Sequence, residues 1–149
     1  MNVALDTNIL AYAEGVNGAD RKRLALELVE QLTPETTLLP VQTLAELFNV
    51  LVKKARRSPA AARDAVLSWG DAFPLIETSN EILAAACDLS ADHRLSLWDA
   101  VIVAAAADGG CRLLLSEALQ DGFTWSGVTV VHPFAANRHP LLDALVTET

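Results

Sequence analysis

The 149-residue sequence has few of the residues from which metal or nucleotide frameworks are usually built, with two cysteines, three histidines and seven glycines. Cys87 and Cys111 lie 24 residues apart in apolar segments. They form no CxxC pair, so we expect two reduced core thiols and no structural zinc site. The glycines form neither a GxGxxG motif nor a GK pair followed by Ser or Thr, which argues against a phosphate-binding loop.

Long hydrophobic runs are also missing. The longest unbroken apolar run, Ala100 to Ala107, is far shorter than the ~20 residues that a membrane-spanning helix needs. The first residues, Met1 to Asp6, lack the basic region and the apolar stretch of a signal peptide. We therefore expect a cytoplasmic protein that has no membrane partner.

Basic residues are scarce as well, and their distribution matters more than their number. The formal net charge is −8, which at first argues against a nucleic-acid partner. Seven of the eleven Lys and Arg nevertheless fall into two clusters, which are either phosphate-contacting patches or solvated helix faces. The first cluster is Arg21, Lys22 and Arg23, and the second is Lys53, Lys54, Arg56 and Arg57.

The apolar content of 52% supplies a sizeable core for one domain. Hydrophobic periodicity predicts helices and short strands in alternation along the chain. The predicted strands are Val3–Leu5, Thr37–Leu39, Pro74–Ile76, Arg112–Leu115 and Val128–Val131. The predicted helices are Ile9–Glu14, Arg21–Leu32, Thr43–Arg56, Pro59–Phe73, Asn80–Asp92 and Trp98–Asp108. This alternation predicts an α/β fold, with a parallel sheet and helices on both faces.

Three acidic residues occupy positions where a carboxylate could serve either structure or chemistry. Asp6 follows the first strand, at the sheet edge where α/β proteins bind ligands, but Asp is also a common helix N-cap. Glu46 lies three residues after Thr43, and Asp99 three residues after Ser96, which is the spacing of a capping box. The apolar neighbours of Glu46 and Asp99 argue for a further partner, because a lone buried carboxylate is costly.

Two more acids, Glu117 and Asp121, follow the strand Arg112–Leu115, although Asp121–Gly122 is also an ordinary turn signal. Three or four acids at strand ends and helix starts would form an oxygen-rich site suited to Mg²⁺ or Mn²⁺. Such a site can hydrolyse phosphodiester bonds with metal-activated water.

These acids lie in segments that resemble the motifs of the PIN-domain family. Ala4–Asn8 is similar to the first motif, Leu44–Leu47 to the second, Ser96–Ala100 to the third and Leu114–Phe134 to the closing segment. The resemblance is strongest to the VapC-type toxin ribonucleases of VapBC toxin–antitoxin pairs. It implies a three-layer PIN-like fold with strand order 3-2-1-4-5 in a nuclease domain of residues 1–134. Residues 135–149 would form a C-terminal tail that is only partly ordered.

The resemblance also implies roles for individual residues in an endoribonuclease that depends on Mg²⁺ or Mn²⁺. Asp6, Glu46 and Asp99 would be catalytic acids, and Thr7 and Ser116 would support them. The metal ligands would be Asp6, Asp99 and Asp121. Many relatives have Asp or Asn where this chain has Ala118, so the fourth acid is open: we assign it to Asp121, with Glu117 as the alternative.

The implied partners are an RNA substrate, a cognate antitoxin and a second copy of the chain in a homodimer. The apolar faces of the helices Arg21–Leu32 and Thr43–Arg56 could serve such contacts or belong to the core. Ala118 and the acidic balance leave an alternative function, which is a catalytically weak PIN-like module that binds RNA or protein.

Overall fold

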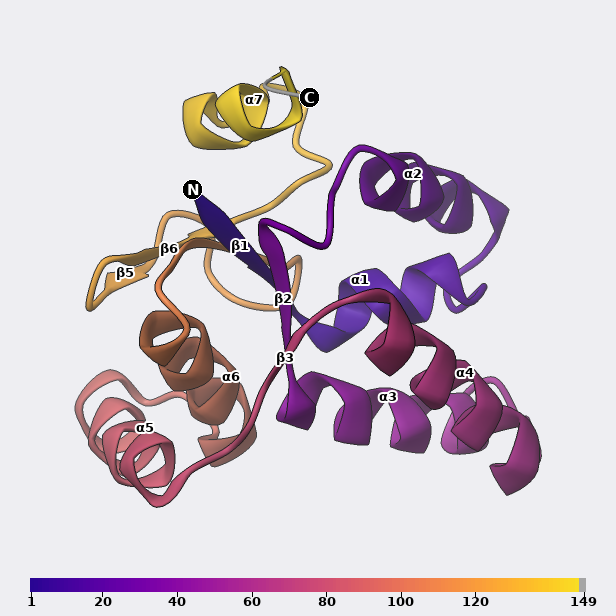
Figure 1. The fold of residues 1–149 in the computed structure, drawn as a ribbon, viewed down its shortest axis with the longest axis horizontal. Coiled ribbons are helices and arrows are strands. Elements are labelled where there is room, and N and C mark those ends of the chain that lie inside the picture. The colour runs from indigo at the N-terminus through magenta and orange to yellow at the C-terminus, as the bar shows by residue number, and fades with distance from the viewer. Residues whose placement is uncertain (148–149) are drawn as a thin grey trace.

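A six-stranded sheet forms the middle layer of the protein, which the computed structural model describes over residues 1–147 (Figure 1). Its strands are β1 (Asn2–Leu5), β2 (Thr37–Pro40), β3 (Leu75–Ile76), β4 (Cys111–Leu115), β5 (Thr124–Trp125) and β6 (Val128–Val131). Their order is β3-β2-β1-β4-β6-β5. All neighbours pair in parallel except β5 and β6. The predicted α/β class and the relative order of the five predicted strands are therefore confirmed.

The predicted order 3-2-1-4-5 was incomplete, because it omitted the short antiparallel strand β5. Thr124 pairs with Thr129 and Trp125 with Val128. The two residues between them, Ser126 and Gly127, have φ angles of 49° and 85°. Positive φ at both turn positions is typical of the two-residue turns that join antiparallel strands. A two-residue strand is too short to show a period-2 pattern, so periodicity did not reveal it.

Helices cover both faces of the sheet, as predicted (Figure 1). Helices α1 (Thr7–Ala13), α2 (Ala19–Glu30), α3 (Val41–Lys53), α4 (Pro59–Ala72) and α7 (Pro140–Thr147) share one apolar cluster with the sheet. Helices α5 (Asn80–His93) and α6 (Leu97–Asp108) share the other. Val3 and Leu5 belong to the first cluster and Ala4 to the second, as the alternation of side chains along a strand requires.

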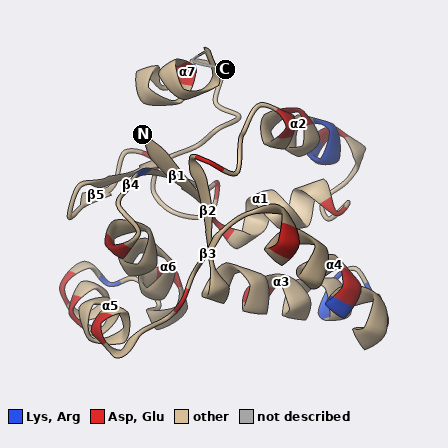
Figure 2. Cartoon of the chain, viewed as in Figure 1, with Lys and Arg blue, Asp and Glu red and all other residues tan. Residues whose placement is uncertain are grey.

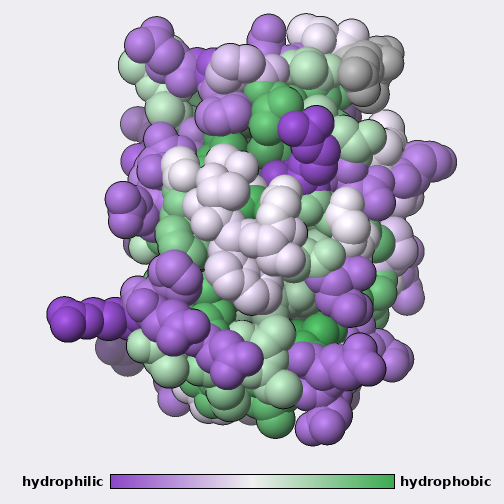
Figure 3. All heavy atoms as spheres, turned by 90° about the vertical axis from the view of Figure 1, so that its left-hand side faces the viewer, coloured by the Kyte–Doolittle hydropathy of each residue, from purple (hydrophilic) through white to green (hydrophobic). Residues whose placement is uncertain are grey.

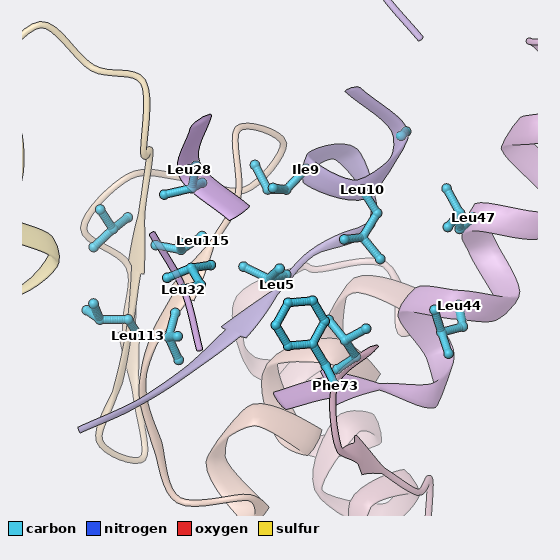
Figure 4. Close-up of a cluster of buried hydrophobic side chains, with 14 of the residues drawn as sticks. Leu5, Ile9, Leu10, Leu28, Leu32, Leu44, Leu47, Phe73, Leu113 and Leu115 are labelled. Atoms are coloured by element: carbon cyan, nitrogen blue, oxygen red, sulfur yellow. The ribbon is translucent and has the colours of Figure 1, made fainter. Parts of the chain in front are cut away.

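The larger core lies between the sheet and helices α1 to α4 (Figure 4). Leu5 and Leu115 on the sheet face the same cluster as Leu28 of α2 and Leu47 of α3, and all four side chains are buried. The apolar faces of α2 and α3, which the sequence left open between core and partner contact, therefore pack inside the chain. This packing fixes the positions of α1 and α3 relative to the end of β1.

The opposite layer places one cysteine differently from the prediction. Cys111 on β4 is buried, and burial raises the pKa of its thiol to about 11. Cys87 is exposed, so the prediction of two core thiols was wrong for this residue. Helix α5 turns Ile82, Ala86 and Leu89 inward, which leaves Cys87 on its outer side.

Hydrophilic and hydrophobic side chains are interspersed over the face shown in Figure 3.

The segment after residue 134 contains helix α7, which the sequence did not predict. Leu142 and Leu145 are buried and extend the larger core, so this part of the tail packs on the domain. Part of the predicted tail, residues 148–149, lies outside the described residues. No helix within residues 1–147 is both long and apolar enough to cross a membrane.

Candidate active site

Asp6 lies where strand β1 passes into helix α1, and only 3% of its surface is exposed. It is the N-cap of α1, with its Oδ1 atom accepting a hydrogen bond of 2.7 Å from the backbone N–H of Thr7. Its Oδ2 atom accepts from the Ser116 hydroxyl at 2.7 Å and from the Asn8 amide at 3.2 Å. The capping interpretation of Asp6 is thus correct, yet it uses only one oxygen of the carboxylate.

Ser116 connects the end of β4 to the end of β1. Leu5 pairs with Leu115 in the parallel ladder, so the residues that follow both strands lie side by side. The buried Ser116 hydroxyl donates to Asp6 and accepts from the backbone N–H groups of Ala118 at 3.0 Å and Leu119 at 3.2 Å. One hydroxyl therefore holds both the carboxylate and the turn that follows β4.

Glu46 reaches the same region from helix α3. The helix begins at Val41 with no side-chain cap, and the Thr43 hydroxyl donates to the backbone oxygen of Leu5 at 3.0 Å. Thr43 is therefore not an N-cap, and the capping-box interpretation of Glu46 was wrong. One turn later, the Glu46 Oε2 atom accepts a hydrogen bond of 3.4 Å from the Thr7 hydroxyl.

Asp99 is placed by the start of helix α6. The Ser96 hydroxyl accepts from the backbone N–H of Asp99 at 3.1 Å, so the predicted N-cap is present. This hydrogen bond uses the Asp99 backbone, while the partly exposed Asp99 carboxylate lines a cavity between α1, α3 and α6.

This cavity, which we call the carboxylate cavity, has a volume of about 280 Å³ and brings together Asp6, Glu46 and Asp99. The other lining residues are Thr7, Asn8, Ala11, Tyr12, Val16, Asn17, Val50, Lys54 and Ala118. Residues from three elements far apart in sequence thus meet at the carboxyl end of β1, where α/β folds commonly bind ligands.

The three acids repel one another in their shared surroundings. Burial, with a smaller contribution from the Asp99 charge, raises the pKa of Asp6, although hydrogen bonds from Ser116 and Thr7 oppose the rise. Burial and the charges of Asp6 and Asp99 raise the pKa of Glu46 to about 7. Such an arrangement favours a species that adds positive charge, either a proton or a cation.

No group of three or more His, Cys, Asp and Glu within the described residues is arranged as a metal-binding cluster. The donor set still suits Mg²⁺ or Mn²⁺, because these ions prefer oxygen ligands and Mg²⁺ commonly keeps several waters while binding one or two carboxylates. Mutually repelling carboxylates around a cavity of about 280 Å³ are the observation on which this fit depends.

Neither residue proposed as the fourth acid lines the carboxylate cavity. The exposed Asp121 accepts a hydrogen bond of 3.0 Å from the backbone N–H of His132, which joins two loops. Glu117 pairs with Arg21 at 3.5 Å. The position after Glu117 is Ala118, which does line the cavity. The catalytic assignment of Asp121 therefore rests on the sequence alone, and the position of its carboxylate argues against a direct role.

The basic residues near the cavity differ in the contacts that they make. Figure 2 marks the positions of Lys and Arg along the chain in blue. The Arg21 guanidinium pairs with Glu117 and lies 5.9 Å from the ring centre of Tyr12. Arg57 pairs with Glu14 at 2.8 Å. Lys54 lines the carboxylate cavity and forms no ion pair with another described residue. Lys54 is therefore the basic side chain best placed to meet a phosphate.

Comparison with known proteins identifies the family. The family model of the PIN domain matches residues 3–117, which is most of the chain. The chain belongs to the PIN domain family. The resemblance found in the sequence motifs is thereby confirmed. No curated protein sequence matches the chain.

Solved structures similar to this PIN domain come from toxin–antitoxin systems. A toxin–antitoxin complex from Klebsiella pneumoniae has 26% identity and a TM-score of 0.66, covering 89% of this chain and 98% of that one. The sarcin–ricin-loop-cleaving toxin VapC20 of Mycobacterium tuberculosis has 18% identity, a TM-score of 0.64 and coverages of 76% and 87%. DNA-bound VapBC from Salmonella typhimurium has 15% identity, a TM-score of 0.61 and coverages of 87% and 96%. The likeness to the latter two lies in the fold.

One residue of the PIN domain site was not predicted to belong to it. The Asn8 amide donates to Asp6 at 3.2 Å and to the Ser116 hydroxyl at 3.3 Å, and its Oδ1 atom accepts from the backbone N–H of Glu117 at 3.0 Å. Asn8 thus repeats the link that Ser116 makes between the two strand ends. Its position two residues after Asp6 was the available signal.

We expect replacement of Asp121 with Asn to change RNA cleavage by less than about threefold, which corresponds to the small effects typical of exposed positions. Its carboxylate lies outside the carboxylate cavity, and the Asn oxygen can still accept from His132. Initial cleavage rates at saturating Mn²⁺ would measure the effect. A loss above about 30-fold would instead place Asp121 among the catalytic acids.

Proposed function

We propose that this PIN domain is a divalent-metal-dependent endoribonuclease and the toxin of a type II toxin–antitoxin pair. The observation that carries the proposal is the convergence of Asp6, Glu46 and Asp99 on one cavity, with raised pKa values for Asp6 and Glu46. Family membership and the toxin–antitoxin complexes among the structural neighbours support the same activity.

Asp6 and Asp99 would hold the cation, with Glu46 beside them. When bound, Mg²⁺ or Mn²⁺ supplies positive charge that activates water and offsets the charge that develops on the phosphate oxygens. The sequence resemblance assigns the fourth acid to Asp121, which does not line the cavity. This arrangement is compatible with Mg²⁺, which readily retains water in place of protein ligands.

The protein's own side chains position the acids and handle protons. Ser116 and Asn8 fix the Oδ2 atom of Asp6, so that Oδ1 and Oδ2 keep one orientation at the end of β1. The Thr7 hydroxyl orients Glu46. Glu46, whose pKa burial and the charges of Asp6 and Asp99 raise to about 7, lies beside the two proposed metal ligands, where a carboxylate could accept a proton from the attacking water.

The partners follow from the same proposal. The substrate is RNA, whose phosphates Lys54 can meet at the cavity rim. The inhibitor is a cognate antitoxin that occludes the carboxylate cavity. The toxin–antitoxin complexes from Klebsiella pneumoniae and Salmonella typhimurium support an antitoxin as the partner. A homodimer of the chain remains part of this proposal.

The test is an RNA-cleavage assay with the full chain, free of antitoxin. Total RNA would be incubated with the protein in about 5 mM Mg²⁺, in about 1 mM Mn²⁺ or in excess EDTA. We expect discrete fragments with either metal, none with EDTA, and recovery when Mn²⁺ is restored. Equal cleavage in EDTA, or no cleavage with either metal, would contradict the proposal.

A second candidate function rests on Ala118, which lines the cavity. The family resemblance leads one to expect Asp or Asn at this position. In this case the chain binds RNA or protein and cleaves weakly. The same assay separates the two functions when RNA binding is measured beside cleavage. Tight, metal-independent RNA binding without fragments would favour the binding module.

A further inference from the structure

A second cavity of about 450 Å³ adjoins the carboxylate cavity. It is lined by Gln42, Ala45, Glu46, Asn49, Val50 and Trp98. Glu46 and Val50 line both cavities, so the two spaces meet along one face of helix α3. The volume lies within the range of about 300–1,000 Å³ that is usual for ligand sites. A strand bound at the three acids can therefore extend into this second space.

Trp98 is the large aromatic surface of the second cavity, and 59% of it is exposed. It directly precedes Asp99 in the first turn of helix α6, whose unbroken run of core residues begins at Ala100. The core of the protein therefore does not require a tryptophan at this position. A flat, exposed ring beside the three acids can instead receive another flat ring by stacking.

Two side-chain amides border the same space. Gln42 and Asn49 are seven residues apart, or about two helical turns, and therefore share one face of α3. Ala45 between them is small, which leaves room between the two amides. The Asn49 amide makes no hydrogen bond to another described residue. An amide both donates and accepts hydrogen bonds, as the edges of nucleobases do.

We propose that Trp98, Gln42 and Asn49 form a nucleobase-binding subsite for single-stranded RNA, an inference that rests on the proposed nuclease function. The base next to the cleaved phosphate stacks on Trp98 and presents its edge to the two amides. Stacking on aromatic side chains is how proteins commonly hold unpaired bases, since every base offers a flat face. A base paired in a duplex is already stacked and cannot enter, so the subsite selects unpaired RNA.

Helix α3 also sets the order of the contacts along the bound strand. Lys54 lies at the C-terminal end of α3 and Gln42 in its first turn, about 18 Å apart at 1.5 Å per residue. Glu46 lies between Gln42 and Lys54 along α3. Of these two, Lys54 lines the carboxylate cavity and Gln42 lines the second cavity, while Glu46 lines both. One strand would thus place a flanking phosphate at Lys54, the cleaved phosphate at the acids and a base at Trp98.

The test measures RNA binding in a protein whose cleavage is strongly slowed, with EDTA present to suppress the remainder. Trp98→Ala and Trp98→Phe would each be combined with Asp6→Asn and titrated into fluorescein-labelled A, U, C and G 12-mers and an RNA duplex. We expect Trp98→Ala to weaken binding of the single strands about 5- to 150-fold, which corresponds to the ~1–3 kcal/mol per stacked base. Trp98→Phe should retain most of the affinity, and the duplex should be insensitive to either change.

Leu67→Ala is the matched control, because Leu67 of α4 also has an exposed fraction of 59% and lines neither cavity. Leu67→Ala combined with Asp6→Asn should bind the single strands with an affinity within twofold of that of the Asp6→Asn protein. Equal affinity of the Trp98→Ala protein would overturn the subsite, as would a loss accompanied by a change from dimer to monomer in light scattering. The latter result would assign Trp98 to a contact between copies of the chain.

Failure of the subsite and failure of the nuclease proposal give different results. If the wild-type chain cleaves RNA with Mn²⁺ but Trp98→Ala leaves single-strand affinity unchanged, the subsite alone is refuted. If the wild-type chain neither cleaves nor binds RNA, the nuclease proposal fails and the subsite fails with it.

Discussion

Replacing Asp6 with Asn is expected to lower the rate of RNA cleavage by about 10²–10³-fold, the scale on which loss of one electrostatic group at a reacting centre acts. Asp6 is the most buried of the three acids and lies between the other acids and the Ser116 hydroxyl. The substitution keeps the size of the side chain but removes the negative charge with which it would bind Mg²⁺ or Mn²⁺. Initial rates with the purified full chain would measure the loss.

The stability of the Asp6→Asn protein is measured beside its cleavage rate, because the substitution changes both the charge of the side chain and its buried hydrogen bonds. The Asn oxygen can still accept from the backbone N–H of Thr7 and so preserve the N-cap. The amide nitrogen then replaces Oδ2 and cannot accept from the Ser116 hydroxyl or the Asn8 amide, so these two hydrogen bonds are lost. Burial raises the pKa of Asp6 in the folded state, so ionisation of this carboxyl opposes folding. The contribution of Asp6 to the free energy of unfolding therefore falls as the pH rises from its unfolded-state pKa through its folded-state pKa. In EDTA, the melting temperature of the variant relative to that of the wild type should therefore rise as the pH is raised from about 5 to about 8.

Asp64→Asn is the control for this experiment. Asp64 is an exposed acid on α4 that pairs with Arg63 at 3.2 Å and lies outside the carboxylate cavity. The Asp64→Asn protein should cleave RNA at a rate within twofold of that of the wild type. Cleavage by the Asp6→Asn protein at a rate within threefold of the wild type would refute the catalytic assignment.

The sheet was predictable because its strands are buried on both faces and bounded by clear helix signals. Leu5, Leu114 and Leu115 lie in runs that only a central strand would bury so completely. The hairpin at β5 was not predicted, although Ser126–Gly127 is a turn signal, because a two-residue strand shows no periodicity. Helix α7 was missed because its stability depends on packing of Leu142 and Leu145 against the domain, which is a long-range effect.

The site was predictable only as a set of residues, because each acid had a competing local explanation. Asp6 caps α1, and Asp99 lies in the first turn of α6, which the Ser96 hydroxyl caps through the Asp99 backbone. The local interpretation therefore holds fully for Asp6 and in part for Asp99. Only for Glu46 does the structure remove the alternative, since the Thr43 hydroxyl bonds to Leu5 instead. Capping and chemistry are compatible here: a helix start fixes the backbone of an acid and leaves carboxylate oxygens facing the cavity. Local sequence patterns therefore could not decide between the two roles.

Ser116→Ala should destabilise the protein by about 2–4 kcal/mol, because several buried groups depend on one hydroxyl. The Ser116 side chain is fully buried, donates to Asp6 and accepts from the backbone N–H groups of Ala118 and Leu119. Its removal leaves the N–H of buried Leu119 without this acceptor. The free energy of unfolding would be measured by urea denaturation in EDTA, with one shared m-value.

Ser79→Ala is the matched control for this loss. Ser79 is exposed and accepts one hydrogen bond, from the backbone N–H of Ile82 at 3.1 Å, as the N-cap of α5. Loss of such a cap costs about 1 kcal/mol. The two variants carry the same chemical change, so the difference between them isolates the buried network around Asp6.

The Ser116→Ala protein should also bind Mn²⁺ about 10–100-fold more weakly, the usual effect of removing a group that orients a metal ligand. Without the 2.7 Å hydrogen bond, the Asp6 carboxylate can rotate away from the cavity. Raising the Mn²⁺ concentration should therefore restore part of the cleavage that is lost at limiting metal, whereas Asp6→Asn should gain little. A stability loss no larger than that of Ser79→Ala, together with unchanged Mn²⁺ affinity, would show that Ser116 does not position Asp6.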